Sequence, residues 1–132
     1  AELYTRKAIE IKPNYPEALS NLGNILNDLG KSKEAELYTR KAIEIKPNYP
    51  EALSNLGNIL NDLGKLKDAE LYTRKAIDIE PNYAEALSNL GNILNGLGKS
   101  KEAEVYLRKA IKLKPDLAIS HSNLGDILRE LG

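Results

Sequence analysis

Asparagine is the residue type whose spacing in this sequence is best suited to recognition chemistry. Asparagines recur at intervals of 34 residues in three rows. The rows are Asn21, Asn55, Asn89 and Asn123; Asn24, Asn58 and Asn92; and Asn27, Asn61 and Asn95. Each amide offers one acceptor and two donors, so it can pair bidentately with the C=O and N–H of a peptide unit whatever the peptide's side chains. The rows therefore predict a surface that holds an extended peptide by its main chain.

Serines accompany the first row, because Ser20, Ser54 and Ser88 each precede one of its asparagines. We expect these serines to contact the peptide as well. Asparagine is a poor helix former compared with Ala, Glu or Lys, so three asparagines per helix are more than solubility requires. An alternative remains open, in which Asn21 and its copies bond within the protein or are solvated residues multiplied by a recent duplication.

Side chains suited to catalysis or metal binding are scarce. The sequence has no Cys and a single His, His121. This excludes a thiolate nucleophile and leaves the usual general base and metal ligand almost absent. Nothing near His121 completes a catalytic or metal-binding set, and paired carboxylates such as Glu34 and Glu36 recur with the repeat as surface charges. We expect no catalytic residue, no metal, no cofactor and no enzymatic activity.

The net charge of the 132-residue chain is zero, with 19 Lys and Arg against 19 Asp and Glu. A general nucleic-acid binder, or a protein that binds anionic membranes, needs a basic excess, so neither partner is expected. No apolar run approaches the ~18 residues of a transmembrane helix, and the start of the chain does not resemble a signal peptide. These observations predict a cytoplasmic location.

The charges are nevertheless segregated along the chain. Residues 16–30, 50–64 and 84–98, which hold the asparagine rows, contain five acids and no base. The five acids are Glu17, Asp28, Glu51, Asp62 and Glu85. The surface around the asparagines should thus be mildly negative and favour neutral or basic peptides. The basic residues lie in the intervening segments, where Glu36 and Arg40 are spaced for an i,i+4 ion pair.

An internal repeat organises the whole chain. Residues 1–15 recur unchanged at 35–49, and the 34-residue block that begins at residue 16 recurs twice, first with four changes and then in a more divergent copy. A fixed period of this length is typical of a solenoid, in which each unit buries its apolar face on its neighbours. The pattern of each unit predicts two helices. The chain is therefore expected to form a single array over residues 1–132, which consists of a lone second helix (1–15), three repeats (16–49, 50–83 and 84–117) and a lone first helix (118–132).

The helix ends follow from residues with special backbone preferences. The first helix of a repeat carries an apolar stripe of helical period, with Pro16 in its first turn. Gly30 is placed for a left-handed cap at its end. The second helix runs from Ser32 to Ile45 and stops before Pro47.

Three finer predictions concern capping and packing. Asn48 and Glu51, with their copies in the other repeats, are placed as a capping pair at the start of the first helix. Gly23 lies inside that helix, where Gly is unfavourable, which indicates close approach of a second helix. The side chains expected to face inward from the second helix are Ala35, Tyr38, Thr39, Ala42, Ile43 and Ile45.

These residues carry a family resemblance. The pattern that resembles the tetratricopeptide repeat consists of Leu19-x-x-Leu22-Gly23-x-x-Leu26, Gly30, Ala35, Ala42 and Pro47, at a period of 34 residues. The resemblance covers the whole chain and implies an all-α fold, a right-handed superhelical solenoid of antiparallel helix pairs with about eight helices. It also implies a concave face lined by the first helices and a binding protein rather than a catalyst. Two departures are Leu19 and Thr39, which stand where the family has aromatic residues.

Two kinds of family member offer comparisons. Tetratricopeptide co-chaperones hold a C-terminal carboxylate with a clamp of Lys, Arg and Asn. The matching places here are Ser20, Ser54, Ser88, Glu51 and Asn89. The cations of the clamp are absent, which argues against heat-shock chaperone tails as partners. The run Ser-Asn-Leu-Gly-Asn is instead similar to the repeats of O-linked N-acetylglucosamine transferase, and this resemblance implies an asparagine ladder at Asn21, Asn55, Asn89 and Asn123.

We therefore predict a non-catalytic scaffold that binds a neutral to basic protein or peptide in its concave groove. Two alternatives stay open: a structural or engineered array with no evolved ligand, and the substrate-holding part of a larger enzyme. The terminal helices also predict weak head-to-tail self-association. The residues expected to meet are Leu124, Ile127 and Leu128 of one chain and Leu3, Ala8 and Ile9 of the next.

Overall fold

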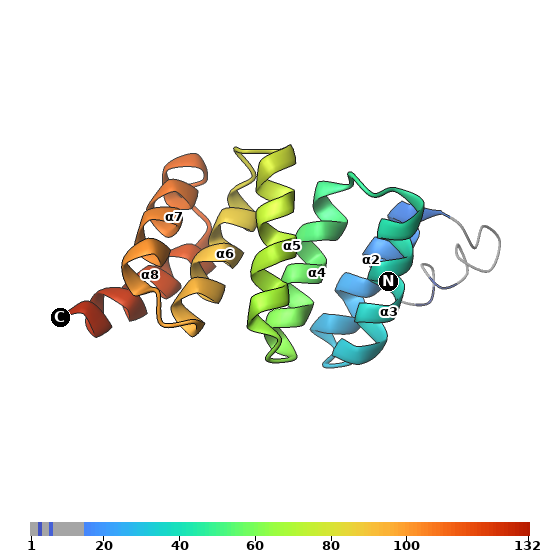
Figure 1. Cartoon of the computed structure of the whole chain (residues 1–132), viewed down its shortest axis with the longest axis horizontal. Helices are drawn as coiled ribbons and strands as arrows, with labels where there is room; N and C mark the ends of the chain where they lie inside the picture. Colours follow the sequence, from blue (N-terminus) through green and yellow to red (C-terminus); the bar gives the residue numbers. More distant parts are fainter. Residues whose placement is uncertain (1–2, 4–5, 7–14) are drawn as a thin grey trace.

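The computed structural model describes residues 3, 6 and 15–132. The described residues form seven α-helices and no strand, which confirms the predicted all-α solenoid of helix pairs (Figure 1). The helices are α2 (Pro16–Asp28), α3 (Ser32–Ile45), α4 (Pro50–Asp62), α5 (Leu66–Ile79), α6 (Ala84–Gly96), α7 (Ser100–Leu113) and α8 (Ala118–Leu131). The further helix predicted over 1–15 lies outside the described residues, apart from Leu3 and Arg6.

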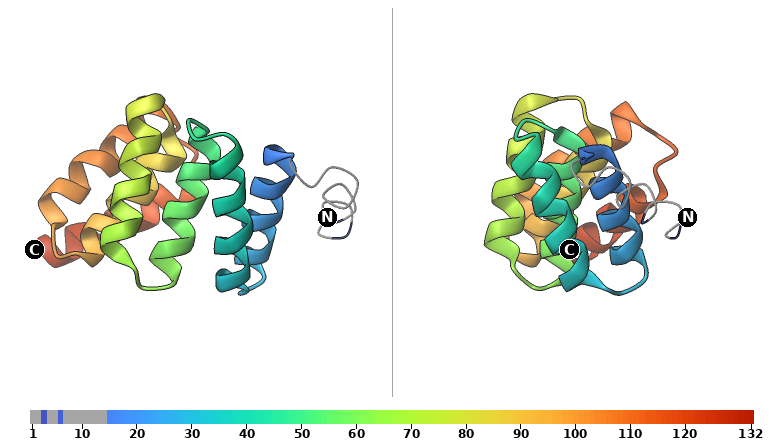
Figure 2. Two further views of the ribbon diagram at one scale, coloured as in Figure 1. Left: turned by 45° about the vertical axis from the view of Figure 1, so that its right-hand side comes forward. Right: turned by 90° about the vertical axis from the view of Figure 1, so that its right-hand side faces the viewer.

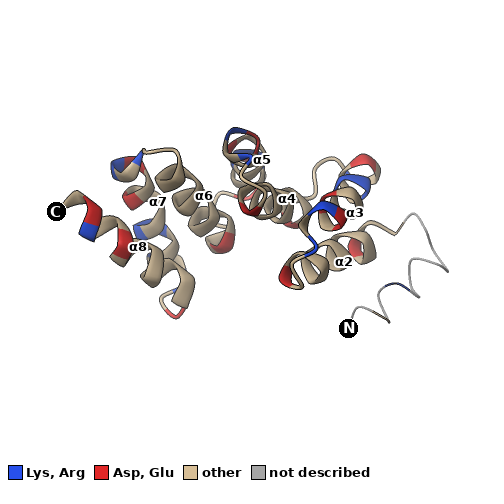
Figure 3. Cartoon of the chain, turned by 90° about the horizontal axis from the view of Figure 1, so that it is seen from below, with Lys and Arg blue, Asp and Glu red and all other residues tan. Residues whose placement is uncertain are grey.

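The helices form two layers, and within each layer they are arranged in the order of the sequence. Figures 1 and 2 show them side by side along the long axis of the molecule, from α2 near the N-terminus to α8 at the C-terminus. Each first helix contacts its own second helix and also the first helix of the next repeat, as α2 does with α4 and α4 with α6. Seen from below, α2, α4, α6 and α8 lie on the inner side of an arch, here called the concave face, and α3, α5 and α7 lie on the outer side (Figure 3).

The first helices end as predicted, at glycines with left-handed backbones. Gly30, Gly64 and Gly98 have φ angles of 80°, 79° and 80°. In the first repeat the amide of Gly30 donates to the carbonyl of Asn27 over 3.0 Å, and that of Lys31 donates to the carbonyl of Leu26 over 2.8 Å. This pair of bonds is the Schellman motif, which satisfies carbonyls at the end of a helix.

The predicted capping pair is wrong. Helix α4 begins at Pro50, so its N-cap is Tyr49 rather than Asn48, and no side chain caps its amides. The same holds for α6, whose N-cap is Tyr83. Pro50 lacks an N–H, so α4 begins with one fewer amide to satisfy. The prediction for Asn14 lies outside the described residues.

The core of each helix pair is built from small residues on the second helix and leucines on the first. Ala35, Thr39 and Ala42 of α3 are buried as predicted, whereas Tyr38 and Ile43 are half-buried. Ile45, the last residue of α3, was expected inside and is 42% exposed.

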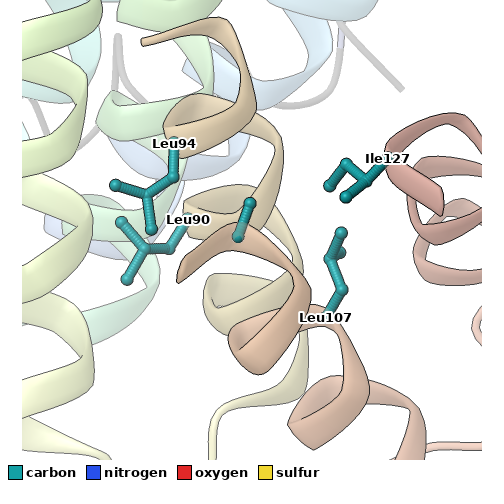
Figure 4. Packing of buried hydrophobic residues seen from close by; sticks show 5 residues of the cluster. Leu90, Leu94, Leu107 and Ile127 are labelled. Carbon is teal, nitrogen blue, oxygen red and sulfur yellow. The ribbon is translucent and has the colours of Figure 1, made fainter. Parts of the chain in front are cut away.

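The apolar clusters cross the boundaries between repeats. Ile59 of α4 packs on Leu22 and Leu26 of the preceding repeat, and Ile93 of α6 packs in the same way on Leu56 and Leu60. Figure 4 shows the last such cluster, with Leu90, Leu94, Leu107 and Ile127. Helices α4, α6 and α8 therefore each bury their isoleucine against the repeat before them, and the core runs continuously through the described part of the array.

Glycine inside the first helix lets the two helices of a repeat approach closely, as predicted. A Cβ atom on Gly57 would lie 2.0 Å from Thr73 Oγ1, and one on Gly23 would lie at the same distance from Thr39 Oγ1. At Gly91 the nearest atom would be Leu107 Cγ, at 2.5 Å. All three distances are far too short for a real carbon, so only Gly fits.

Replacing Gly57 by Leu should lower the free energy of unfolding by on the order of 3 kcal/mol, because the new side chain forces α4 and α5 apart. The matched control is Gly125→Leu, since nothing described lies within 4 Å of a Cβ atom placed there. Leu is the better helix former, so this variant should be as stable as the parent or slightly more. Chemical denaturation of the three proteins provides the comparison. Equal midpoints for Gly57→Leu and the parent would refute the close approach.

Candidate functional site

The first asparagine row connects neighbouring repeats on the concave face. Asn55 Nδ2 of α4 donates to Ser20 Oγ of α2 over 3.1 Å. Asn89 Nδ2 of α6 donates to Ser54 Oγ of α4 over 3.3 Å. Each bond joins two successive first helices, so the row fixes both the orientation of the amides and the spacing of the helices that carry them.

The serines of this row lie behind the asparagines. Ser20, Ser54 and Ser88 are 1%, 2% and 1% exposed, so a ligand on the surface does not reach them. This corrects the prediction that they line the groove. Ser20 and Ser54 each accept a hydrogen bond from an asparagine of the next repeat. Ser88 Oγ is buried and has no hydrogen-bond partner among the described residues.

The amides of the row keep part of their hydrogen-bonding capacity. Asn55 and Asn89 each use one of two N–H groups on a serine, and within residues 15–132 neither makes a further side-chain hydrogen bond. One N–H and the carbonyl oxygen of each amide thus stay available for a peptide unit. The sequence left two roles open for this row, hydrogen bonding within the protein and binding of a peptide. These amides can serve both roles at once.

The second row consists of Asn24, Asn58 and Asn92, on the same helices. Asn24 and Asn92 are exposed and Asn58 is half-buried. Among the described residues none of the three forms a side-chain hydrogen bond, so their whole amides remain open to solvent or to a ligand. In the first row, Asn21 is exposed and Asn123 is half-buried.

The third row has a structural role at two of its positions. Asn27 is buried, donates to Asp62 Oδ2 over 2.8 Å and accepts from Ser32 Oγ over 2.7 Å. Asn95 accepts from Ser100 Oγ over 2.8 Å. The bonds from Ser32 and Ser100 tie the end of a first helix to the start of the second helix that follows it. The bond to Asp62 joins α2 to the next first helix, α4.

An acidic cavity of about 350 Å³ lies where the second and third repeats meet. Its lining residues are Glu51, Glu80, Asn82, Tyr83, Ala84, Glu85, Leu113 and Lys114. Glu80 takes the place that Lys46 and Lys114 hold in the other repeats, so this junction carries a reversed charge. Of its three carboxylates, only that of Glu85 is paired with a lysine, Lys114, over 2.6 Å.

The acidic surrounding affects the pKa of the Tyr83 hydroxyl. Burial is the main cause that raises its pKa to about 12, and the carboxylates of Glu51, Glu85 and Glu80 add to the rise. A hydrogen bond with Ser54 works in the opposite direction. The cavity therefore disfavours a further negative charge and is suited to a cationic group.

The basic side chains gather on the outer helices, as Figure 3 shows for α3, α5 and α7. The predicted ion pair between Arg40 Nε and Glu36 Oε2 is present at 2.9 Å, and Arg40 Nη1 also donates to Tyr72 of the next repeat over 3.1 Å. Arg74 repeats this arrangement with Tyr106 and adds a bond to Glu102 over 2.8 Å. The outer cations thus hold repeats together.

The remaining candidates show no catalytic arrangement in the described part of the chain. His121 Nε2 lies 2.7 Å from the carbonyl oxygen of Pro115, a local contact at the start of α8. No group of three or more potential metal ligands gathers among the residues that were placed. Of the described helices, none has the length and apolar character needed to cross a bilayer.

Comparison with known families bears on this surface. A family model described as tetratricopeptide repeat matches residues 16–49, 50–83 and 84–117. These are the three full repeats that the sequence predicts. None of the curated proteins compared with the chain matches it.

Solved structures similar to this chain include three with different contexts. MamA has a TM-score of 0.81 and 24% identity, over 97% of this chain and 75% of MamA, and this likeness shows the fold alone. The first TPR of Spaghetti, bound to an HSP90 peptide, has a TM-score of 0.81 and 25% identity, over 88% of this chain and 92% of that one. A mutant O-GlcNAc transferase of Thermobaculum terrenum has a TM-score of 0.82 and 28% identity, over 86% of this chain but 22% of the transferase.

The Tyr83 hydroxyl should ionise near pH 12 in the folded protein, because burial and three carboxylates disfavour its charged form. A free tyrosine ionises near pH 10, so the unfolded chain loses this proton first and the stability of the fold should fall between pH 10 and pH 12. Tyrosinate absorbance, compared between the parent and Tyr83→Phe, measures the titration. A Tyr83 signal complete by pH 10 would contradict the burial of its hydroxyl.

Proposed function

Because the chain belongs to the tetratricopeptide repeat family, we propose that it is a non-catalytic scaffold that binds a peptide or a partner protein in its concave face. Tetratricopeptide repeats are typically interaction modules rather than catalysts. The similar domain of Spaghetti binds an HSP90 peptide. We propose that the present chain also binds a peptide, but not the HSP90 peptide.

The observation that carries the proposal is the anchored amides of Asn55 and Asn89. Each is held by a buried serine and keeps one donor and one acceptor. Neighbouring packed helices are about 8–10 Å apart, and an extended chain rises about 3.3 Å per residue. A peptide along the groove would thus meet one amide of the row about every three residues. Because the amides are already oriented, binding loses little side-chain entropy.

The partner we propose is neutral to basic and is neither a nucleic acid nor a membrane. The acidic cavity lined by Glu51, Glu80 and Glu85 is suited to a lysine or arginine side chain of the peptide. The HSP90 peptide in the Spaghetti complex, SRMEEVD, carries three acidic residues. Here Ser54 and Glu51 stand where a carboxylate clamp needs cations, so a peptide of that charge is disfavoured.

Two alternatives remain, and only the first predicts different behaviour of this surface. A structural or engineered array with no evolved ligand would recover no preferred peptide. The substrate-holding part of a larger enzyme would bind peptides in the same way as an independent scaffold. The similar part of the O-GlcNAc transferase is only 22% of that protein. A similar array thus occurs there as one part of a larger enzyme, which keeps this second alternative open.

Changing Asn55 and Asn89 together to Ala should weaken binding of peptides selected from a display library of random linear peptides by at least about tenfold, or 1.4 kcal/mol. The stability of the fold should change by less than about 1 kcal/mol, since the gain in helix propensity offsets the lost bonds to serine. Fluorescence anisotropy gives the dissociation constants and thermal unfolding gives the stability.

The matched control for this experiment is the double variant Ser20→Ala and Ser54→Ala. It removes the anchors but keeps the amides, so its loss of affinity should be smaller than that of the asparagine variant. Equal affinities of the parent and the asparagine variant would refute the role of the amides in binding.

We further propose weak head-to-tail self-association of the 132-residue chain. Leu128 of α8 is 43% exposed, whereas its equivalent in α2, Leu26, is fully buried, and a Cβ atom on Gly125 would meet nothing described. The corresponding face of α2 is covered by α3, whose residues 35–45 have the same letters as residues 1–11. A second copy therefore carries a segment that matches this face.

One residue of the predicted contact is wrong. Ile127 is fully buried against Leu90, Leu94 and Leu107 of its own chain, because the isoleucine of each first helix faces the preceding repeat. The surface offered to a second copy consists of Leu124 and Leu128 beside Gly125. On the other side of the contact, Leu3 is 65% exposed, whereas Ala8 and Ile9 lie outside the described residues.

Gly125→Leu should abolish this association without unfolding the monomer, because the new side chain occupies the place into which a second helix would pack. Sedimentation velocity from micromolar to millimolar concentration measures the association. Ser122→Ala, at an exposed position of the same helix, serves as the control and should associate like the parent. A parent that stays monomeric at millimolar concentration would disprove the contact.

A further inference from the structure

Asn61 differs from the other asparagines of its row. Asn27 and Asn95 are bonded to Ser32 and Ser100, the first residues of the second helices that follow. The corresponding residue after Asn61 is Leu66, which has no hydroxyl group. Asn61 has therefore lost the partner that holds its neighbours in the row.

The second partner of this position is missing as well. Asn27 donates to Asp62 of the next first helix over 2.8 Å, and the residue equivalent to Asp62 in the following repeat is Gly96. Two substitutions, one on each side, thus remove both bonds from the same amide. Within residues 15–132, Asn61 is half-buried and forms no side-chain hydrogen bond.

Leu66 occupies the place of the missing carboxylate. A Cβ atom on Gly96 would lie 3.3 Å from Leu66 Cδ1 and 3.6 Å from Leu66 Cδ2. A side chain at position 96 would thus begin in tight contact with the methyl groups of Leu66, and Gly96 makes room for them. The result is an amide with all of its donors and acceptors unused beside a half-buried apolar side chain.

The amide of Asn61 reaches solvent, because its polar atoms are not among the buried side-chain atoms that lack a hydrogen-bond partner in the described structure. Asn27, by comparison, already uses one N–H group and its carbonyl oxygen in two bonds within the protein. A ligand can therefore pair with Asn61 without breaking a side-chain hydrogen bond of the protein.

We propose that Asn61 and Leu66 form a subsite for one residue of the bound peptide. The amide of Asn61 pairs with the main chain of that residue, and the methyl groups of Leu66 hold its apolar side chain. This inference rests on the proposed peptide-binding function and adds to it a preference for an apolar residue at one place in the ligand.

Asn58 lies between Asn55 and Asn61 on the surface of α4, since the three follow one another at intervals of three residues. Each step turns the side chain about 60° round the helix axis, so Asn61 points about 120° away from Asn55, which bonds to the preceding repeat. All three amides keep unused hydrogen-bonding capacity in the described structure, whereas Asn27 of α2 is buried and uses one N–H group and its oxygen.

The decisive experiment restores the bonds seen at the α2–α4 junction. The double variant Leu66→Ser and Gly96→Asp places around Asn61 the same residues that surround Asn27. This combination already folds in the same chain, so the variant should keep the thermal stability of the parent. Its hydroxyl and carboxylate should engage the amide of Asn61 and withdraw it from the ligand.

Peptides selected by the parent from the random linear library should share an apolar residue at one fixed place. Peptides selected by the double variant should lose that preference, and its affinity for the parent's peptides should fall about fivefold to tenfold. Asn61→Ala should lower affinity by about fivefold while keeping the apolar preference, because Leu66 remains. Asn27→Ala is the control and should leave affinity unchanged while reducing stability.

The outcomes separate this inference from the function on which it rests. Unchanged affinity and an unchanged apolar preference in the Leu66→Ser and Gly96→Asp variant would overturn the subsite, even where the Asn55 and Asn89 variant still loses binding. Recovery of no peptide by the parent would overturn the subsite together with the proposed function. Loss of the apolar preference in the double variant, with its fold intact, supports the subsite.

Discussion

The close approach of two helices at a glycine is the constraint on which the rest of this structure depends. The glycine brings each first helix against its own second helix, so that Thr39 Oγ1 lies where a Cβ atom on Gly23 would be. That distance fixes the shape of one repeat. Because the repeats are nearly identical in sequence, the same shape is stacked again and again, and the rows of asparagines on the first helices come into line. A wider helix pair would change the angle between repeats and separate the amides that bond across them.

The repeats are joined differently on the two sides of the arch. On the concave face, neutral side chains make the connections, as in the bond from Asn55 to Ser20. On the outer face, arginines make them, and Arg74 reaches both Tyr106 and Glu102 of the next repeat. This division leaves α2, α4 and α6 without cations and with unused amides. The groove is therefore polar and mildly acidic because of the residue types that connect neighbouring repeats on each side of the arch.

The sequence predicts those features that depend on local backbone geometry. The cap at Gly30, the boundaries of α3 and the close contact at Gly23 each follow from a residue with special backbone freedom at a fixed place in the repeat. The errors concern which neighbour a side chain faces. Ile127 and Ser20 lie on helix faces that turn towards an adjacent repeat, and a helical period alone does not tell this face from the groove. The absence of both bonds at Asn61 depends on Leu66 and Gly96, which are 30 residues apart in the sequence and meet only in the folded chain.

The joints between repeats also differ from one another. Between the first and second repeats, the concave face has two ties, Asn55 to Ser20 and Asn27 to Asp62. Between the second and third repeats it has one, whereas the outer face gains the bond from Arg74 to Glu102. The second joint therefore has fewer concave ties than the first. Between α6 and α8 the corresponding tie is missing among the described residues, because Ser88 Oγ has no hydrogen-bond partner. The concave ties thus decrease in number towards α8, and the groove is held less firmly at that end of the array.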